Sequence, residues 1–247
     1  MLIVQGVEKT YIKGGMFSRQ KQVVLQNISF DVHPGECLGI IGESGSGKST
    51  LGRLLLGIEN PDRGSIRFEG MEIGQRKARR GRISAVFQDY TSSLHPFYTV
   101  EQALLEPLRL SKHPREELSA KVDLLLRQVG LDPSYRKKYP HELSGGEAQR
   151  VCIARAVSTE PRCIVLDEAI SSLDGSVQFQ VLELLKGLRE TYAMSYVFIT
   201  HDLQAAAYIC DRIMIIREGQ VTDIIPVAEL KNAQSGYARQ LLSAMIP

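Results

Sequence analysis

The most constraining feature of this chain is a glycine-rich segment of eight residues, Gly42-Glu43-Ser44-Gly45-Ser46-Gly47-Lys48-Ser49. It has the form G-x-x-x-x-G-K-[ST], which is typical of a phosphate-binding loop between a strand and a helix. Glycines at positions 42, 45 and 47 permit turns and close approaches that a Cβ would block, so successive backbone N–H groups can surround phosphates. The segment therefore predicts a site for a nucleoside triphosphate with magnesium.

The flanking sequence agrees with this interpretation. Cys37–Ile41 is a short apolar run that predicts a strand, and 50–57 predicts a helix whose N-terminal dipole faces the phosphates. Lys48 is expected on the β- and γ-phosphates, and the Ser49 hydroxyl is expected to bind magnesium. The other expected cofactor-binding residues of this stretch are Gly42, Glu43, Ser44, Gly45, Ser46, Gly47 and Thr50. The alternative is a Gly/Ser-rich surface turn, which the order of strand, loop and helix disfavours.

A second feature is the apolar run 164–166 followed by two carboxylates, Asp167 and Glu168. A phosphoryl-transfer site needs one carboxylate that holds magnesium and another that orients or deprotonates the attacking water. Asp167 suits the first role and Glu168 the second. Alone, such a strand end is better explained as solvated. Paired with the glycine-rich loop it gains weight, because parallel strands bring their carboxyl ends to one crevice.

Composition limits the classes of function. The chain has 247 residues, 43% hydrophobic and 23% charged, which suits one α/β domain. A net charge of +2 is too small to indicate a nucleic-acid partner. The basic run 75–82 is expected to be a solvated loop, with a loop near a membrane surface as the alternative.

Cysteine usage and hydropathy suggest a cytoplasmic protein. The four cysteines lack metal-ligand spacing, so we expect buried thiols in a reducing compartment. No apolar stretch approaches the roughly 18 residues that span a bilayer, and residues 1–4 predict a strand rather than a signal peptide.

Hydrophobic periodicity predicts a parallel sheet wrapped by helices. The pattern is helical from Val100 to about Ala156, with an apolar stripe through Val122, Leu125, Leu126 and Val129. Predicted strands lie at 2–7, 23–32, 65–68, 83–88, 163–166, 196–200 and 212–217, and predicted helices at 177–190 and 203–210. The first two strands are expected to be antiparallel.

The segment 143–150, Leu-Ser-Gly-Gly-Glu-Ala-Gln-Arg, is the sharpest discriminator. In physical terms it predicts an anion site before a helix that starts at Glu147. The alternative is an ordinary helix cap, with Ser144 and Glu147 forming a capping box. Both interpretations stay open on this segment alone.

Taken together, the chain resembles the nucleotide-binding subunit of an ATP-binding cassette (ABC) transporter. The motifs of that family occur in order across nearly the whole sequence: Tyr11, 42–49, Gln88, 143–147, 167–168, 171–174 and His201. The resemblance implies an α/β fold: a P-loop NTPase (RecA-like) core with a parallel sheet, an N-terminal antiparallel β-subdomain and an inserted α-helical subdomain. It implies a single ABC ATPase domain over 1–247. The expected parts are mainly a β-subdomain at 1–35 and 60–87, mainly a helical subdomain at 89–160, a nucleotide core at 36–59 and 161–225, and a short C-terminal tail at 226–247.

The resemblance also implies roles for individual residues, with ATP and Mg²⁺ as cofactors. Tyr11 would stack on adenine, and Gln88 would contact magnesium and water. Glu168 would polarise the attacking water, while His201 would hold the γ-phosphate and the catalytic Glu in place. Magnesium would be held by Ser49, Gln88 and Asp167. In a head-to-tail dimer the partner's γ-phosphate would be contacted by Ser144, Gly145 and Gly146.

The implied partners are a second, paralogous ABC ATPase subunit, two transmembrane permeases and an extracytoplasmic solute-binding protein, with no nucleic acid. The subunit would be peripheral, at the cytoplasmic face of the cell membrane.

A finer resemblance points to importers of oligopeptides, dipeptides, nickel and metallophores, and within them to the second of the two ATPase subunits. It is carried by residues 14–17, 87–96, 149–156 and 166–174. The tail 236–242 is similar to the start of the C-terminal extension of peptide importers, yet the chain stops at Pro247. We therefore expect an ATPase for nickel or metal-chelate import. The alternatives are a di- or oligopeptide importer, an exporter, or a soluble ABC ATPase outside transport.

Overall fold

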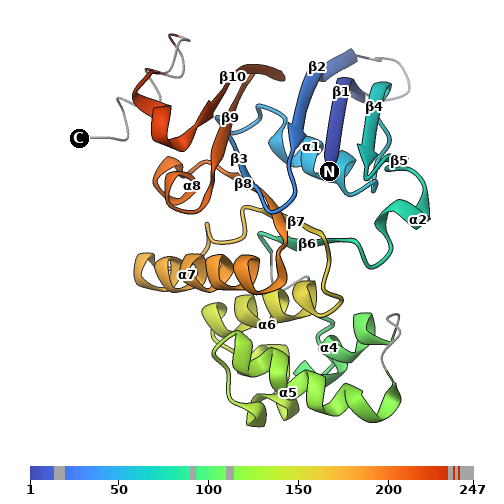
Figure 1. Cartoon of the computed structure of the whole chain (residues 1–247), viewed down its shortest axis with the longest axis vertical. Helices are drawn as coiled ribbons and strands as arrows, with labels where there is room; N and C mark the ends of the chain where they lie inside the picture. The colour runs from blue at the N-terminus through green and yellow to red at the C-terminus, as the bar shows by residue number, and fades with distance from the viewer. Residues whose placement is uncertain (14–19, 90–92, 110–113, 233–235, 237–238, 240–247) are drawn as a thin grey trace. The chain divides into compact units, whose positions relative to one another are not determined.

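The structure, a computed structural model, describes residues 1–13, 20–89, 93–109, 114–232, 236 and 239. It divides into two compact units (Figure 1). Unit 1 consists of Met1–Arg80 and Ser195–Pro247, and unit 2 of Gly81–Met194.

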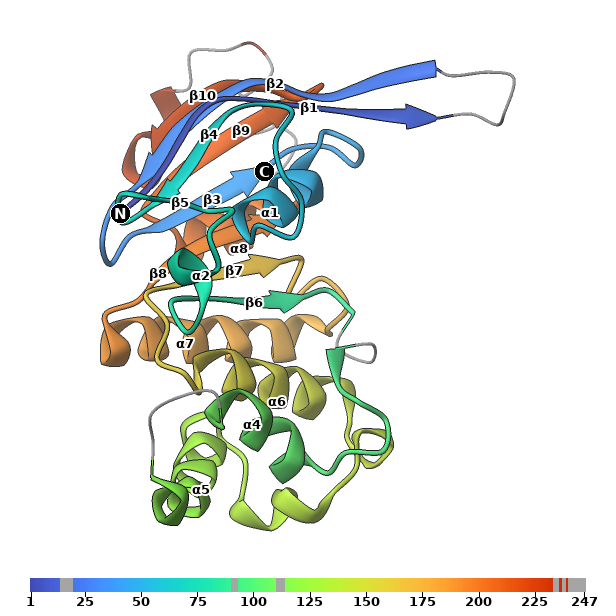
Figure 2. The same cartoon turned by 90° about the vertical axis from the view of Figure 1, so that its right-hand side faces the viewer.

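Unit 1 contains an antiparallel sheet with the strand order β2-β1-β4-β5. Its strands are β1 (Leu2–Lys13), β2 (Gln20–Val32), β4 (Arg63–Phe68) and β5 (Met71–Glu72). Figure 2 shows β1 and β2 as a long ribbon beside β4. Both strands are longer than the predicted 2–7 and 23–32, because polar residues at their far ends continue to pair, from Lys9 opposite Leu25 to Lys13 opposite Gln20.

The second group of paired strands in unit 1 has the order β10-β9-β3-β8. β3 (Cys37–Ile41) is parallel to β8 (Ser195–Thr200) and to β9 (Arg212–Arg217), and β10 (Gln220–Pro226) is antiparallel to β9. Every residue of β3 and β8 is buried, as expected for strands covered on both faces. β10 was not predicted. It forms a hairpin with β9 through Glu218 and Gly219, which have φ of 49° and 76°.

Two helices pack on these strands, α1 (Lys48–Leu55) against β8 and α8 (Leu203–Ile209) against β3 and β8. The prediction of a loop over the basic run was wrong in part, since α2 (Arg76–Arg79) forms there. Arg79 Nη1 donates to the carbonyl oxygens of Leu56 and Gly57, which satisfies the C-terminal end of α1. A short 3₁₀ helix, η4 (Val227–Asn232), follows β10.

Unit 2 combines two parallel strands with helices. β6 (Ile83–Phe87) pairs with β7 (Cys163–Asp167), and α6 (Gly145–Val157) packs against β6. The predicted helical stretch 100–156 is divided into several helices, and all four residues of its apolar stripe are buried. The other helices in the described residues of unit 2 are α4 (Val100–Leu108), α5 (Leu118–Gln128), α7 (Gly175–Tyr192), η1 (Arg115–Glu117), η2 (Pro133–Lys137) and η3 (Pro140–Glu142).

All four cysteines are free and buried, as predicted. Cys37 and Cys210 lie with their Sγ atoms 3.4 Å apart. Burial raises the pKa of the Cys152 thiol to about 12, so this thiol stays protonated at neutral pH. Within the described residues, no helix is long and apolar enough to cross a membrane.

Candidate functional site

The glycine-rich loop of unit 1 joins β3 to α1, as the sequence predicted. Gly42 is packed so closely that an added Cβ would lie 2.1 Å from the Ile216 carbonyl oxygen. Gly47 has φ of 102°, and a Cβ there would lie 2.7 Å from Leu25 Cδ2. Gly45 has φ of 80° with nothing within 4 Å of the Cβ position. The loop therefore needs glycine at 42 and 47 for space and at 45 for its backbone conformation.

Lys48 lies inside this loop. Its side chain is buried, and its ammonium donates to the carbonyl oxygens of Gly42 at 2.7 Å and Glu43 at 3.0 Å. These bonds place a positive charge against the backbone of the loop. Helix α1 begins at Lys48, two residues earlier than predicted.

The start of α1 fits a bound anion. Its N-cap residue Gly47 supplies no side-chain cap, and the first turn contains no acidic residue. Ser46 Oγ is buried with no hydrogen-bond partner in the structure. The helix dipole and an orphaned hydroxyl are features that a phosphate would satisfy. Glu43, Ser44 and Ser49 are exposed around it, and Thr50 is buried in the first turn.

His201 lies at the same edge of the sheet as the loop. Ile41 and Thr200 are opposite each other in the parallel pair of β3 and β8, so the loop and His201 both leave from this edge. His201 is exposed. The next residue, Asp202, accepts hydrogen bonds from the N–H groups of Gln204 and Ala205 and so caps α8.

Tyr11 lies near the end of β1 and is half-buried. Its hydroxyl donates to Glu59 Oε2 at 2.5 Å and accepts from Arg53 Nη2 at 3.3 Å. Sequence analysis did not single out Arg53 or Glu59. The only local signal is that Arg53 follows Thr50 by three positions on a helix, a spacing that brings side chains together.

Three of the predicted residues of unit 2 lie at one strand edge. Phe87 and Asp167 are opposite each other at the ends of β6 and β7, so Gln88 and Glu168 follow at the same edge. Asp167 and Glu168 are half-buried and Gln88 is exposed. Glu168 has a left-handed backbone, with φ of 51°. Its carbonyl oxygen accepts hydrogen bonds from both the N–H and the hydroxyl of Ser171, which hold this uncommon conformation.

Ser144, Gly145 and Gly146 form the start of α6, also in unit 2. The helix begins at Gly145, so the predicted start at Glu147 was wrong. Ser144 Oγ accepts from the Glu147 N–H at 3.3 Å, and Glu147 Oε2 accepts from the Ser144 N–H at 2.7 Å, which is a complete capping box. Hydrogen bonds from the Tyr135 hydroxyl and then the Ser144 N–H lower the pKa of Glu147, so it stays ionised in the cap.

The residues expected at magnesium, Ser49, Gln88 and Asp167, all offer oxygen atoms, the donors that Mg²⁺ prefers. Ser49 belongs to unit 1, the other two to unit 2. In the described parts of the chain, no group of three or more His, Cys, Asp or Glu is arranged to hold a metal ion.

Unit 2 also presents an exposed surface of three aromatic rings and a proline. We define this aromatic surface as Phe97, Tyr139 and His141 together with Pro96. These residues, with Lys137 and Glu142, line an open hollow of about 740 Å³. The Phe97 side chain is 80% exposed, and the rings of Tyr139 and His141 stack with centroids 5.7 Å apart. The parts of the finer resemblance at 14–17 and 90–92, and most of 236–242, lie outside the described residues.

Comparison with known proteins agrees with these features. The family model described as "ABC transporter" matches residues 25–171. The chain is 47% identical over 247 residues to the metal-staphylopine import system ATP-binding protein CntF of Staphylococcus aureus (strain NCTC 8325 / PS 47), covering 100% of this chain and 99% of that protein. It is 41% identical over 255 residues to the nickel import ATP-binding protein NikE of Escherichia coli (strain K12), covering 100% and 95%.

Among solved structures, the chain is similar to a dimeric post-hydrolysis state of the ATP-binding cassette MJ0796 bound to ADP and Pi. The TM-score is 0.82 with 29% identity, covering 92% of this chain and 99% of that one. This similarity confirms the predicted α/β fold class.

The first prediction compares two glycines of one loop. Gly42→Ala should destabilise the protein by about 3 kcal/mol or more, because its Cβ would meet backbone oxygen that cannot move aside. Gly45→Ala should cost only about 1–2 kcal/mol, the strain of a left-handed backbone, since its Cβ would contact nothing. Chemical denaturation of both variants measures the difference. Equal losses would contradict the close packing at Gly42.

Proposed function

The chain belongs to the ABC transporter family, and on that premise we propose that it is the ATP-hydrolysing subunit of an importer for nickel or a metal chelate. The observation that carries the proposal is full-length similarity to two metal-import ATPases, 47% identity to CntF and 41% to NikE over all of this chain. Import of di- or oligopeptides is the alternative. A soluble ABC ATPase outside transport is the weaker one, since both relatives are import subunits by name.

Within this function the loop residues bind the phosphates of ATP. Lys48 neutralises the β- and γ-phosphates from its place inside the loop, and backbone N–H groups of 42–50 surround them. Tyr11 supplies an aromatic face for adenine. Ser49, Gln88 and Asp167 would hold magnesium, which would supply charge neutralisation to the phosphates.

Glu168 is the group that acts on the attacking water, and His201 holds the γ-phosphate. The Ser171 bonds hold the backbone of Glu168 in its uncommon conformation, and so they fix the direction in which this side chain leaves the chain. A fixed direction suits a role that needs good orientation before the nucleotide arrives. Gln88 and Glu168 follow the paired ends of β6 and β7, so they lie at the same strand edge. In this proposal Gln88 would contact the same water and metal as the two carboxylates.

The chain works as one half of a head-to-tail dimer with a paralogous ATPase, in which Ser144, Gly145 and Gly146 contact the γ-phosphate bound by the partner. The capping box leaves this role open. It uses Ser144 Oγ as an acceptor, and the hydroxyl hydrogen can still be donated to a phosphate oxygen.

Two permeases and an extracytoplasmic solute-binding protein complete the importer, with this subunit peripheral at the cytoplasmic face of the membrane. The exposed aromatic surface of unit 2 suits contact with a permease segment, because aromatic side chains are enriched where proteins bind one another. Residues 36–59 and 161–225 form the nucleotide core in this proposal, 1–35 and 60–87 mainly the β-subdomain, 89–160 mainly the helical subdomain and 226–247 the tail.

The catalytic assignment predicts the behaviour of Glu168→Gln. Turnover should fall by about 100-fold or more, because the carboxylate acts on water, while ATP affinity should stay within about 3-fold. Steady-state hydrolysis and ATP titration measure the two effects. Glu183→Gln, an exposed change on α7, is the matched control and should retain activity. Substantial turnover by Glu168→Gln would remove it from the catalytic role.

The shared site predicts complementation between two inactive chains. Ser144→Arg should bind ATP through its own loop yet fail to hydrolyse it, and Lys48→Ala should bind ATP weakly. In a mixed dimer one site combines the intact loop of the first chain with the intact Ser144 of the second, so mixing should restore hydrolysis. If a mixed dimer of the two chains forms and restores nothing, or if Ser144→Arg loses ATP binding as a monomer, the head-to-tail model is wrong.

Substrate class is tested by uptake in cells that lack their own nickel and peptide importers. The cells express this chain together with the two permeases and the solute-binding protein that are encoded beside it. We expect accumulation of radioactive nickel, free or chelated, that disappears with Glu168→Gln. A labelled dipeptide should not accumulate. Peptide uptake without metal uptake would overturn the metal assignment and leave the ATPase assignment standing.

A further inference from the structure

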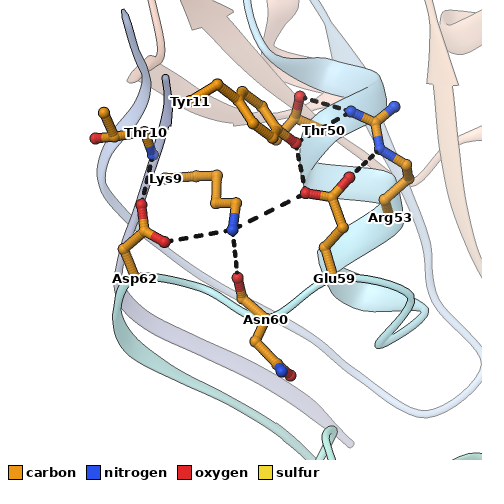
Figure 3. A network of polar contacts seen from close by, with 8 residues as sticks. All are labelled: Lys9, Thr10, Tyr11, Thr50, Arg53, Glu59, Asn60 and Asp62. Atoms are coloured by element: carbon orange, nitrogen blue, oxygen red, sulfur yellow. Dashed lines mark hydrogen bonds and ion pairs between the residues drawn. The ribbon is translucent and has the colours of Figure 1, made fainter. Parts of the chain in front are cut away.

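A network of polar contacts connects the end of β1 to helix α1 in unit 1 (Figure 3). It draws on three segments: Lys9, Thr10 and Tyr11 at the end of β1; Thr50 and Arg53 on α1; and Glu59, Asn60 and Asp62 in the segment after α1. No motif in the sequence includes Arg53 or the segment 59–62.

The centre of the network is a triangle of Tyr11, Glu59 and Arg53. Glu59 Oε2 accepts from the Tyr11 hydroxyl at 2.5 Å, and Glu59 Oε1 accepts from Arg53 Nε at 2.6 Å. Arg53 Nη2 closes the triangle at 3.3 Å from the Tyr11 hydroxyl. Bonds to an ionised partner are short and strong, so this triangle fixes the outer end of the Tyr11 ring.

Arg53 also connects the ring to the phosphate loop. Its Nη2 donates to Thr50 Oγ1 at 3.1 Å, and Thr50 is buried in the first turn of α1, two residues after Lys48. The Tyr11 hydroxyl is therefore only two hydrogen bonds away from the turn that faces the phosphates.

The segment 59–62 anchors the part of β1 that immediately precedes Tyr11. Asp62 Oδ2 accepts from the Thr10 N–H at 2.6 Å, and the Asp62 N–H donates to the Glu8 carbonyl oxygen at 2.9 Å. The Lys9 ammonium donates to the Asn60 carbonyl oxygen at 2.8 Å and lies over the Tyr11 ring, 5.6 Å from its centroid. Backbone and ring are thus both anchored, the backbone by Asp62 and the ring by Glu59 and Arg53.

Hydrogen bonding from Tyr11, and then from Arg53, lowers the pKa of Glu59 below its ordinary value. The carboxylate is therefore ionised at neutral pH and can only accept hydrogen bonds. This agrees with the geometry, in which both of its oxygens receive donors.

We propose that Glu59 and Arg53 are positioning residues for the nucleotide base, which hold the Tyr11 ring in a fixed place relative to the first turn of α1. This inference rests on the proposed stacking role of Tyr11. A ring that is ordered before binding loses less entropy when the base stacks on it, so the network strengthens recognition of the base without touching the phosphates.

The test compares ATP with inorganic tripolyphosphate, which offers phosphates without a base, by competition against a labelled nucleotide. Tyr11→Phe and Glu59→Ala should each bind ATP about 3- to 10-fold more weakly, while tripolyphosphate binding stays within about 2-fold. KM for ATP should rise with little change in kcat. Glu72→Ala is the matched control: it removes a similar Glu–Arg contact, Arg67 Nε to Glu72 Oε1 at 2.7 Å, and should change neither affinity.

A double variant tests whether the two residues act together. The double variant Tyr11→Phe/Glu59→Ala should bind ATP no more weakly than the single variant with the lower ATP affinity. The reason is that both changes remove the same hydrogen bond, from the Tyr11 hydroxyl to Glu59. Additive losses would overturn the inference. Equal losses for ATP and tripolyphosphate would also overturn it, since the network would then act by supporting the phosphate loop.

Tyr11→Ala separates this inference from the proposed function. It removes the ring itself and should weaken ATP binding at least as much as Tyr11→Phe. If Tyr11→Ala retains ATP affinity, the stacking role fails and the inference fails with it. If Tyr11→Ala weakens ATP binding while Tyr11→Phe and Glu59→Ala do not, only the positioning role is overturned.

Discussion

The close approach of backbone to Gly42 is the contact on which unit 1 depends. The Ile216 carbonyl oxygen occupies the space that any side chain at position 42 would need, so β9 must end against the start of the phosphate loop. The hairpin after β9 continues this packing, because the Gly219 N–H donates to the Ser46 carbonyl oxygen at 3.2 Å and the Gln26 N–H donates to that of Gly219 at 2.8 Å. The turn between β9 and β10 therefore connects the antiparallel sheet, through Gln26, to the glycine-rich loop, through Ser46.

Unit 2 uses a different device to fix its polar groups. Asp167 and Glu168 stand where an apolar strand stops, and a positive φ at Glu168 turns the chain there. The cost of that backbone is offset by two hydrogen bonds from Ser171. At α6 the Ser144 hydroxyl caps the helix by accepting a hydrogen bond from the Glu147 N–H. The same hydroxyl can still donate its hydrogen to an anion outside the helix, so the cap is compatible with anion binding. The choice between a helix cap and an anion site at this segment was therefore not exclusive.

Local signals predicted much of this arrangement. Cys37–Ile41 and Arg212–Arg217 were recognisable as strands because a buried parallel strand is a continuous apolar run, and glycine spacing identified the loop between β3 and α1. What failed depends on distant partners. The sequence of β10 contains both polar and apolar residues, and it forms a strand because it pairs with β9. α2 forms where a basic loop was expected, with Arg79 satisfying carbonyl oxygens more than 20 positions away. The contact between Tyr11 and Glu59, 48 positions apart, left no periodic signal.

In the proposed function, phosphate recognition and base recognition would have different physical origins in this chain. The loop from 42 to 48 offers backbone groups, whose positions follow from the strand before it and the helix after it. Tyr11 offers a side chain on a strand of the other sheet, and backbone geometry alone does not set the angle of its ring. Arg53 can do so because it follows Thr50 on the helix after the loop and bonds both Thr50 Oγ1 and the Tyr11 hydroxyl. The position of the ring is therefore set relative to the turn that is proposed to bind the phosphates. In this proposal a single helix would thus provide the frame for both ends of the nucleotide.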